Sequence, residues 1–138
     1  MSSLIDFFKD DRFAVDAGVE LLEIAPGYAR GQMRVTERNL NADGVCQGGA
    51  IFTLADLVFA AAVNSHLKHT VGTSAQITFL RPGRLGEVLT AEAHEVFDHP
   101  RLPFARVEVR DSQGELVALY SSSGYRRKDS VIEVQTLS

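Results

Sequence analysis

The sequence has little cysteine and no basic excess, and both shortages narrow the functions open to it. Its 138 residues include one cysteine, Cys46, which excludes an internal disulfide and a zinc site built from several cysteines. The formal net charge of −4 argues against a nucleic-acid-binding protein, because such proteins need a basic surface to neutralise phosphates. A chain with one cysteine suits a reducing compartment, so we expect a cytoplasmic protein.

Long hydrophobic runs are also missing. The longest apolar stretch, residues 50–63, is interrupted by Thr53 and Asp56 and is too short to span a bilayer. The first residues, MSSLIDFFKDDRF, lack the basic start and apolar core of a signal peptide. We therefore expect no membrane association. The four histidines show no metal-ligand spacing with acidic residues, so we also expect no metal site.

The residues that are present predict one globular domain over residues 1–138, with a short helix within 1–12 and a loose tail over 126–138. Residues 50–66 contain no glycine or proline and are apolar on nearly every face, which predicts a helix buried all round. Strand-like segments separated by turn formers surround it at 19–25, 29–38, 71–80, 87–97, 103–110 and 115–125. This order predicts an α+β fold with an antiparallel sheet wrapped around one long central helix.

Asp56 is the residue of this helix that most needs an explanation. It stands in the most apolar segment of the chain, where an ionised carboxylate is costly unless it is paired, hydrogen-bonded or facing a cavity. One interpretation is a carboxylate bonded to a neighbouring hydroxyl or backbone group at a subunit interface. The other is a functional carboxylate, because charged side chains are rarely buried without a partner or a role.

Gly48 and Gly49 lie where a loop rich in turn formers meets the helix. Without a Cβ atom they let a ligand approach the backbone, and the N–H groups of a helix N-terminus suit a developing oxyanion. Gly48 and Asp56 are eight residues apart, roughly 12 Å along a helix axis, so one reacting carbon cannot contact both in one chain. If both act on one carbonyl, two antiparallel helices across a two-fold axis must supply them, which predicts a homodimer.

The stretch NADGVCQGGAIFTLADLVFAAAVNS resembles the PaaI-like thioesterase pattern of Asn, a short loop, His-Gly-Gly, a helix and Asp. The resemblance extends to SAQITFLRPGR and to FARVEVRDSQGELVALYSS, and so covers most of the chain. It implies the hotdog fold, pairing of subunits through a continuous sheet, and association of dimers into a homotetramer. It also implies hydrolysis of an aryl- or acyl-CoA thioester to the free acid and coenzyme A, with no cofactor beyond the coenzyme A of the substrate.

By the same resemblance, the catalytic residues are Asp56, Gly48 and Asn41. Asp56 acts as general base or nucleophile, the Gly48 amide polarises the thioester carbonyl, and Asn41 places the nucleophile or its water. Gln47 stands where the family has histidine, and glutamine cannot carry a proton near neutral pH as imidazole can. A noncatalytic acyl-CoA-binding protein therefore remains an alternative. A hotdog acyl-CoA dehydratase or hydratase is another, although no histidine lies between Asn41 and Asn64.

Further residues are candidates for substrate binding. Gln47 and Gly49 belong to the motif itself. Thr73 and Ser74 are either ordinary strand residues or hydroxyls beside the site, as family members often have there. Coenzyme A carries several phosphate charges, so a local cationic patch is needed. The candidates are Arg81 with Arg84, which the resemblance favours, and the run 126–128 (RRK).

Overall fold

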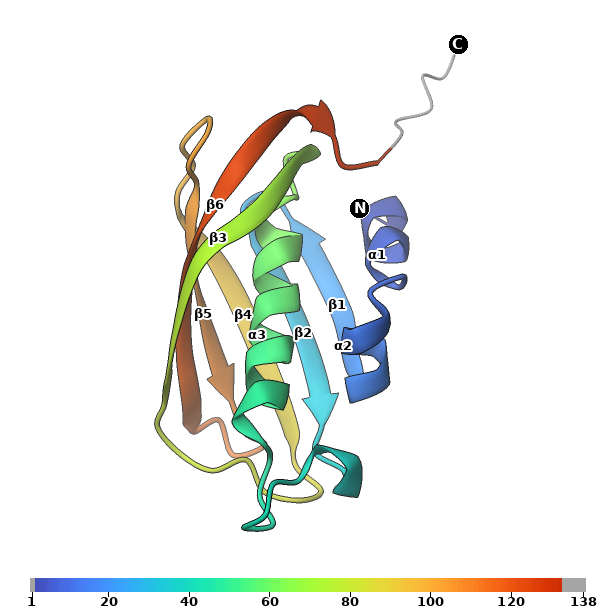
Figure 1. Cartoon of the computed structure of the whole chain (residues 1–138), viewed down its shortest axis with the longest axis vertical. Helices are drawn as coiled ribbons and strands as arrows, with labels where there is room; N and C mark the ends of the chain where they lie inside the picture. Colours follow the sequence, from blue (N-terminus) through green and yellow to red (C-terminus); the bar gives the residue numbers. More distant parts are fainter. Residues whose placement is uncertain (1, 133–138) are drawn as a thin grey trace.

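A curled antiparallel sheet of six strands surrounds one long helix in the computed structural model, which describes residues 2–132 (Figure 1). The helices are α1 (Ser2–Phe8), α2 (Arg12–Ala17) and α3 (Gly48–Val63), with a 3₁₀ turn, η1, at Glu37–Asn39. The strands are β1 (Val19–Ala25), β2 (Tyr28–Arg34), β3 (Lys68–Phe79), β4 (Val88–Phe97), β5 (Phe104–Arg110) and β6 (Leu116–Ser130). Their order across the sheet is β1-β2-β4-β5-β6-β3. The predicted α+β arrangement is confirmed.

Two predicted boundaries were wrong, namely the end of the second strand and the start of the loose tail. The short helix expected within 1–12 corresponds to α1. A second helix, α2, was not predicted, and it begins because the Asp11 carboxylate accepts from the Ala14 amide. The second strand ends at Arg34 rather than at 38. Asn39 Oδ1 accepts from the amide and the hydroxyl of Thr36 and stabilises η1 instead.

The second error concerns the segment expected to be loose from residue 126 onward. Strand β6 continues to Ser130, paired with the start of β3 through Arg126 opposite Thr70 and Ser130 opposite Lys68. The rest of that prediction, residues 133–138, lies outside the described residues. Strand β6 is therefore the longest of the six strands and carries side chains to both ends of the molecule.

Helix α3 packs its apolar side chains against the concave face of the sheet. Leu54, Val58 and Val63 are fully buried there. The helix approaches β2 so closely that a Cβ atom on Gly31 would lie 2.8 Å from a methyl group of Val58. The helix is not buried all round, however, because Asp56 lies on its exposed side. The central helix thus presents one open stripe, which the sequence pattern did not predict.

The two edges of the sheet differ in what covers them. At one edge, α1 and α2 pack beside β1 (Figure 1). At the other edge, β3 is exposed from Val71 to its end at Phe79, apart from the partly buried Ile77, and the next residue, Leu80, is exposed too. An exposed edge strand of this length is a template for pairing with another chain. Among the helices of residues 2–132, none is long and apolar enough to cross a membrane.

Candidate functional site

Helix α3 begins at Gly48 because Gln47 caps it. Gln47 Oε1 accepts from the Gly49 amide at 2.6 Å, and the Gln47 carbonyl accepts from the amides of Ala50 and Ile51. Within residues 2–132, no acceptor lies within hydrogen-bonding distance of the Gly48 amide. Gln47 therefore occupies the Gly49 amide of the first turn and, among the described residues, leaves the Gly48 amide without an acceptor.

Asn41 organises the loop that leads to this helix. Its Oδ1 accepts from the amides of Asp43 (2.9 Å) and Val45 (3.2 Å), and its own amide donates to the Val45 carbonyl. These bonds close a tight loop around Gly44, whose φ of 80° is readily adopted by glycine. Asn41 thus fixes the loop that precedes Gly48.

An open pocket of about 390 Å³ joins Asn41, Gly48 and Arg81, three residues that the sequence placed in the site. Phe79 lines the same pocket, and a Cβ atom on Gly48 would lie 3.0 Å from its ring. Only glycine therefore leaves the phenyl ring in place and the backbone open to a ligand. The pocket lies at the start of α3, beside the end of the exposed edge strand β3.

Asp56 lies two turns further along the same helix, on its exposed side. Tyr120 of β6 donates a hydrogen bond to Asp56 Oδ1 at 2.5 Å. The Tyr120 ring is 1% exposed and is packed between the rings of Phe52 and Phe59. Burial, together with the neighbouring carboxylate, raises the pKa of Tyr120, so the phenol stays protonated and remains a donor. The sequence analysis missed this tyrosine.

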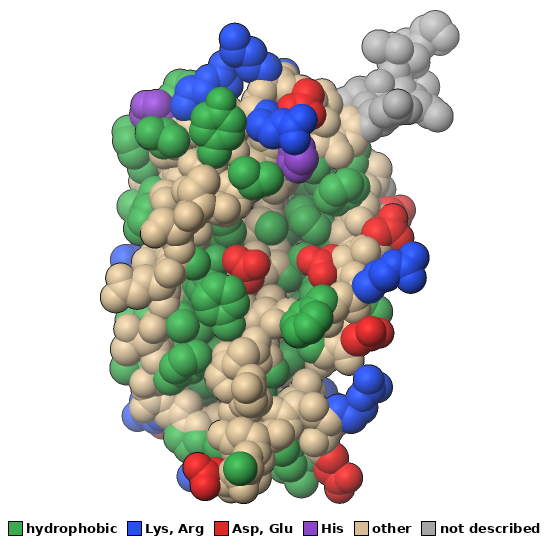
Figure 2. Space-filling view, viewed as in Figure 1, with side chains coloured by type: hydrophobic (Ala, Val, Ile, Leu, Met, Phe, Trp, Pro, Cys, Tyr) green, Lys and Arg blue, Asp and Glu red, His purple; other side chains and the backbone are tan. Residues whose placement is uncertain are grey.

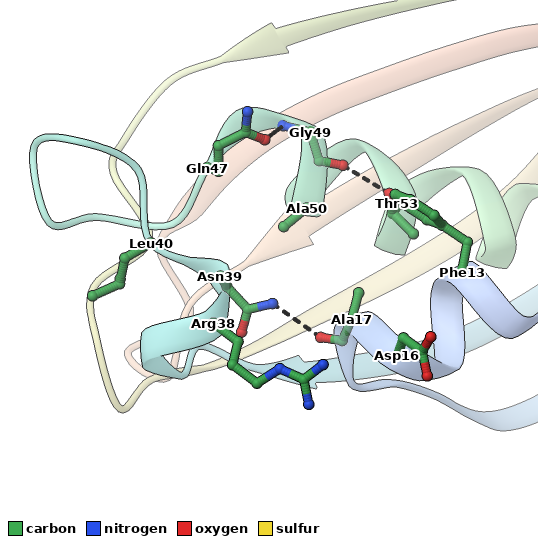
Figure 3. A pocket seen from close by; sticks show the side chains of 10 residues that line it. All are labelled: Phe13, Asp16, Ala17, Arg38, Asn39, Leu40, Gln47, Gly49, Ala50 and Thr53. Carbon is green, nitrogen blue, oxygen red and sulfur yellow. Dashed lines mark hydrogen bonds between the residues drawn. The ribbon is translucent and has the colours of Figure 1, made fainter.

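A second pocket, of about 450 Å³, opens on the other side of the α3 N-terminus (Figure 3). Figure 3 shows Gln47 and Thr53 of the helix start on one side, and Arg38 of η1 and Asp16 of α2 on the other. Gly49 also lines this pocket, so the two glycines of the motif serve two different pockets. Asp56 follows Thr53 by one helical turn on the same open stripe.

Thr73, Ser74 and Arg84 line neither of these two pockets, and the charge of Arg81 is engaged elsewhere. Thr73 Oγ1 lies 3.0 Å from Ser123 Oγ on the neighbouring strand β6, and Ser74 lies on the exposed edge of β3. Arg81 is 3.0 Å from Glu115 and also donates to the Leu116 carbonyl, so its charge is balanced within the chain. Arg84 is exposed in the turn after β3.

Cys46 lines the pocket at Gly48 but is unsuited to react, and the four histidines line neither pocket. Cys46 is 4% exposed, and burial raises the pKa of its thiol to about 11, which makes it a buried apolar side chain rather than a nucleophile. His66 lies with Glu95 and Asp98, and ligand atoms of the three are within 4.8 Å of one another. Sequence spacing did not predict this cluster, because the fold brings the three residues together from different elements. Arg126 also pairs with both carboxylates and supplies their positive charge.

The sequence and the fold of this chain are both similar to those of known proteins. Residues 43–118 match the thioesterase superfamily. A putative esterase of Archaeoglobus fulgidus is 40% identical over 86% of this chain and 77% of its own length. The acyl-coenzyme A thioesterase PaaI of Escherichia coli is 34% identical over 86% of this chain and 85% of its own. The structure of the E. coli PaaI protein, from the phenylacetic acid degradation operon, matches with a TM-score of 0.87 and 32% identity over 91% of each chain.

Proposed function

The chain belongs to the thioesterase superfamily as a PaaI-like member with the hotdog fold, and from this premise we propose that Asp56 is its catalytic carboxylate. The protein is an acyl-CoA thioesterase, which hydrolyses the thioester to a free acid and coenzyme A. The observation that carries the proposal for Asp56 is its place on the open stripe of an otherwise buried helix, with one oxygen held by Tyr120. Its second oxygen is left to act on water or on the substrate.

The Gly48 amide supplies the other half of the reaction. Its N–H has no acceptor among residues 2–132, and it lies in the first turn of α3, where the helix dipole favours a developing negative charge. When the carbonyl oxygen of the thioester accepts from this amide, attack at the carbonyl carbon places the growing charge on the same donor. Asp56 then either removes a proton from the attacking water or attacks the carbon itself, and the thiolate of coenzyme A leaves. Asn41 supports the donor by holding the loop before it.

The two halves belong to different subunits. Gly48 and Asp56 are roughly 12 Å apart along α3, as the rise of ~1.5 Å per residue requires. Pairing of two β3 edges would place two α3 helices antiparallel across a two-fold axis, with the Gly48 of one chain beside the Asp56 of the other. The exposed side chains of residues 71–80 support this seam.

A further association into a homotetramer is supported by the outer face of the sheet. Exposed hydrophobic side chains on β4, β5 and β6 and in the β4–β5 loop include Phe97, Leu102, Phe104 and Tyr125. We propose that the enzyme is cytoplasmic. We also propose that it needs no cofactor beyond the coenzyme A of its substrate.

The proposed catalytic residue is tested by turnover of a panel of acyl-CoA thioesters, including phenylacetyl, hydroxybenzoyl and straight-chain compounds. Release of free thiol is followed for the wild type, for Asp56→Asn and for the control Asp10→Asn, whose carboxylate is exposed on the N-terminal segment. Hydrolysis by the wild type and the control that falls by orders of magnitude in Asp56→Asn is the expected result. Undiminished turnover by Asp56→Asn would remove Asp56 from the mechanism. Binding of acyl-CoA without turnover by the wild type would instead indicate a noncatalytic binding protein.

A further inference from the structure

A cationic pocket lies at the end of the molecule where β3 begins and β6 ends, away from the pockets at Gly48. Its volume is about 230 Å³, and all but one of its lining residues carry a positive charge. They are Lys68, Pro100, Arg101, Arg126, Arg127 and Lys128. Figure 2 shows Lys and Arg side chains gathered at this end of the molecule. We call this site the cationic pocket.

The fold holds two of these cations in place without neutralising them. Lys68 Nζ donates to the Lys128 carbonyl at 3.2 Å, and Arg101 Nη1 donates to the Arg126 carbonyl at 3.0 Å. Both acceptors are backbone groups of β6, which have no net charge. The side chains are thus oriented before any ligand arrives, which lowers the entropy cost of binding an anion.

Charge is unevenly balanced across the pocket. Arg126 is buried and pairs with Glu95 (3.2 Å) and Asp98 (2.5 Å), while its Nε–H has no acceptor within residues 2–132. Arg127 pairs with Asp129 at 2.9 Å.

The other three cations, Lys68, Arg101 and Lys128, have no carboxylate within 4.0 Å in the described part of the chain. In a protein of net charge −4, three neighbouring unbalanced cations repel one another and favour a bound anion.

The position of the pocket indicates which anion it takes. Within one chain, the cationic pocket lies beyond the C-terminal end of α3, whereas Gly48 lies at its N-terminal end. The helix has 16 residues, and at ~1.5 Å per residue its two ends are roughly 24 Å apart. Antiparallel pairing of two β3 edges reverses this relationship. It brings Lys68, at the start of one β3, toward Phe79, at the end of the partner's β3, beside the partner's Gly48 pocket.

We propose that the cationic pocket of each subunit binds the phosphate groups of the coenzyme A whose thioester lies in the partner's Gly48 pocket. This inference rests on the proposed function and on the β3 seam. The cationic pocket, rather than Arg81, is then the main phosphate ligand, because Arg81 already pairs with Glu115. Arg101 provides a fork of N–H donors and the two lysines provide point charges, a combination suited to phosphate.

The test compares the double variant Lys68→Gln/Lys128→Gln with a control of the same net charge, Arg12→Gln/Arg106→Gln. All four side chains are exposed, and the control pair lies outside the cationic pocket. Each protein is assayed on an acyl-CoA, on the same acyl group on dephospho-CoA, and on the acyl-pantetheine thioester, which has no nucleotide phosphates. For the pocket variant, KM for acyl-CoA should rise about ten-fold at unchanged kcat, because two exposed lysine charges that face the phosphates are lost.

The acyl-pantetheine thioester decides whether the effect belongs to the phosphates. All three proteins should turn it over with equal kinetics, and added inorganic phosphate should compete with acyl-CoA for the wild type but not for the pocket variant. Equal KM values for acyl-CoA in the pocket variant and the control would overturn the proposal while leaving the thioesterase intact. If the wild type cleaves no thioester, the proposed function fails, and calorimetric titration with coenzyme A still decides the pocket. Weaker binding by the pocket variant supports the proposal, and equal binding refutes it.

Discussion

The hydroxyl of Tyr120 lies 2.5 Å from Oδ1 of Asp56, so a fully buried phenol from the last strand holds the carboxylate that projects from the central helix. The bond fixes one carboxylate oxygen of a side chain that is otherwise exposed on the open stripe. Hydrogen bonds to charged groups are worth about 1.5–3 kcal/mol, more than those between neutral groups.

Tyr120→Phe removes this donor and keeps the ring between Phe52 and Phe59. We expect kcat to fall about 10- to 100-fold, because each 1.36 kcal/mol of lost transition-state stabilisation costs about ten-fold. KM and the melting temperature should change little. Steady-state thiol release measures the effect, with Tyr125→Phe as control, since Tyr125 is exposed on the same strand. A loss of stability with unchanged kcat would show that the tyrosine serves the fold alone.

Mixing two inactive variants tests whether the site is shared between subunits. Asp56→Asn keeps the amide half of the site, and Gly48→Val keeps the carboxylate half while its side chain meets Phe79. Refolding the two together gives heterodimers with one complete site each. About a quarter of wild-type activity should return, because half of the dimers are then mixed and half of their sites are whole. Each variant refolded alone serves as the control, and no recovery would place both groups in one chain.

Gln47→Ala tests the cap of α3. We expect the free energy of unfolding to fall by about 1 kcal/mol, the usual cost of losing a side chain that accepts from a first-turn amide. Urea denaturation measures this, with Gln113→Ala in an exposed turn as the matched control. If both glutamine variants unfold at the same urea concentration, the contact with Gly49 contributes nothing to stability.

The reactivity of Cys46 tests its environment. Because burial raises its pKa to about 11, the thiol is neutral through the physiological range and becomes a thiolate only near that pH. The native protein should therefore react slowly with a disulfide reagent at pH 8, and rapidly once unfolded in guanidinium. Fast labelling of the native protein at pH 8 would contradict this burial.

The elements with a strong local signal were predictable from the sequence, and contacts between distant elements were not. Turn formers separated the strands, and the cost of an apolar-flanked carboxylate singled out Asp56. Tyr120 escaped notice because only the pairing of β5 with β6 turns it toward the helix. The cationic pocket needed the β3–β6 register to bring Lys68 beside residues 126–128. The grouping of His66 with Glu95 and Asp98 was not predictable either, because it also depends on contacts between distant elements.

Strand β6 carries both Tyr120 and Arg126, and their spacing of six residues has a consequence for how the gene can change. Both side chains are buried on the concave side, since alternate residues of a strand share a face. Insertion or deletion of one codon between them would turn one of the two outward, and would separate either the tyrosine from its carboxylate or the arginine from Glu95 and Asp98. We therefore expect length variation among descendants of this gene to fall in the turns before β6, such as residues 111–115, and not within the strand.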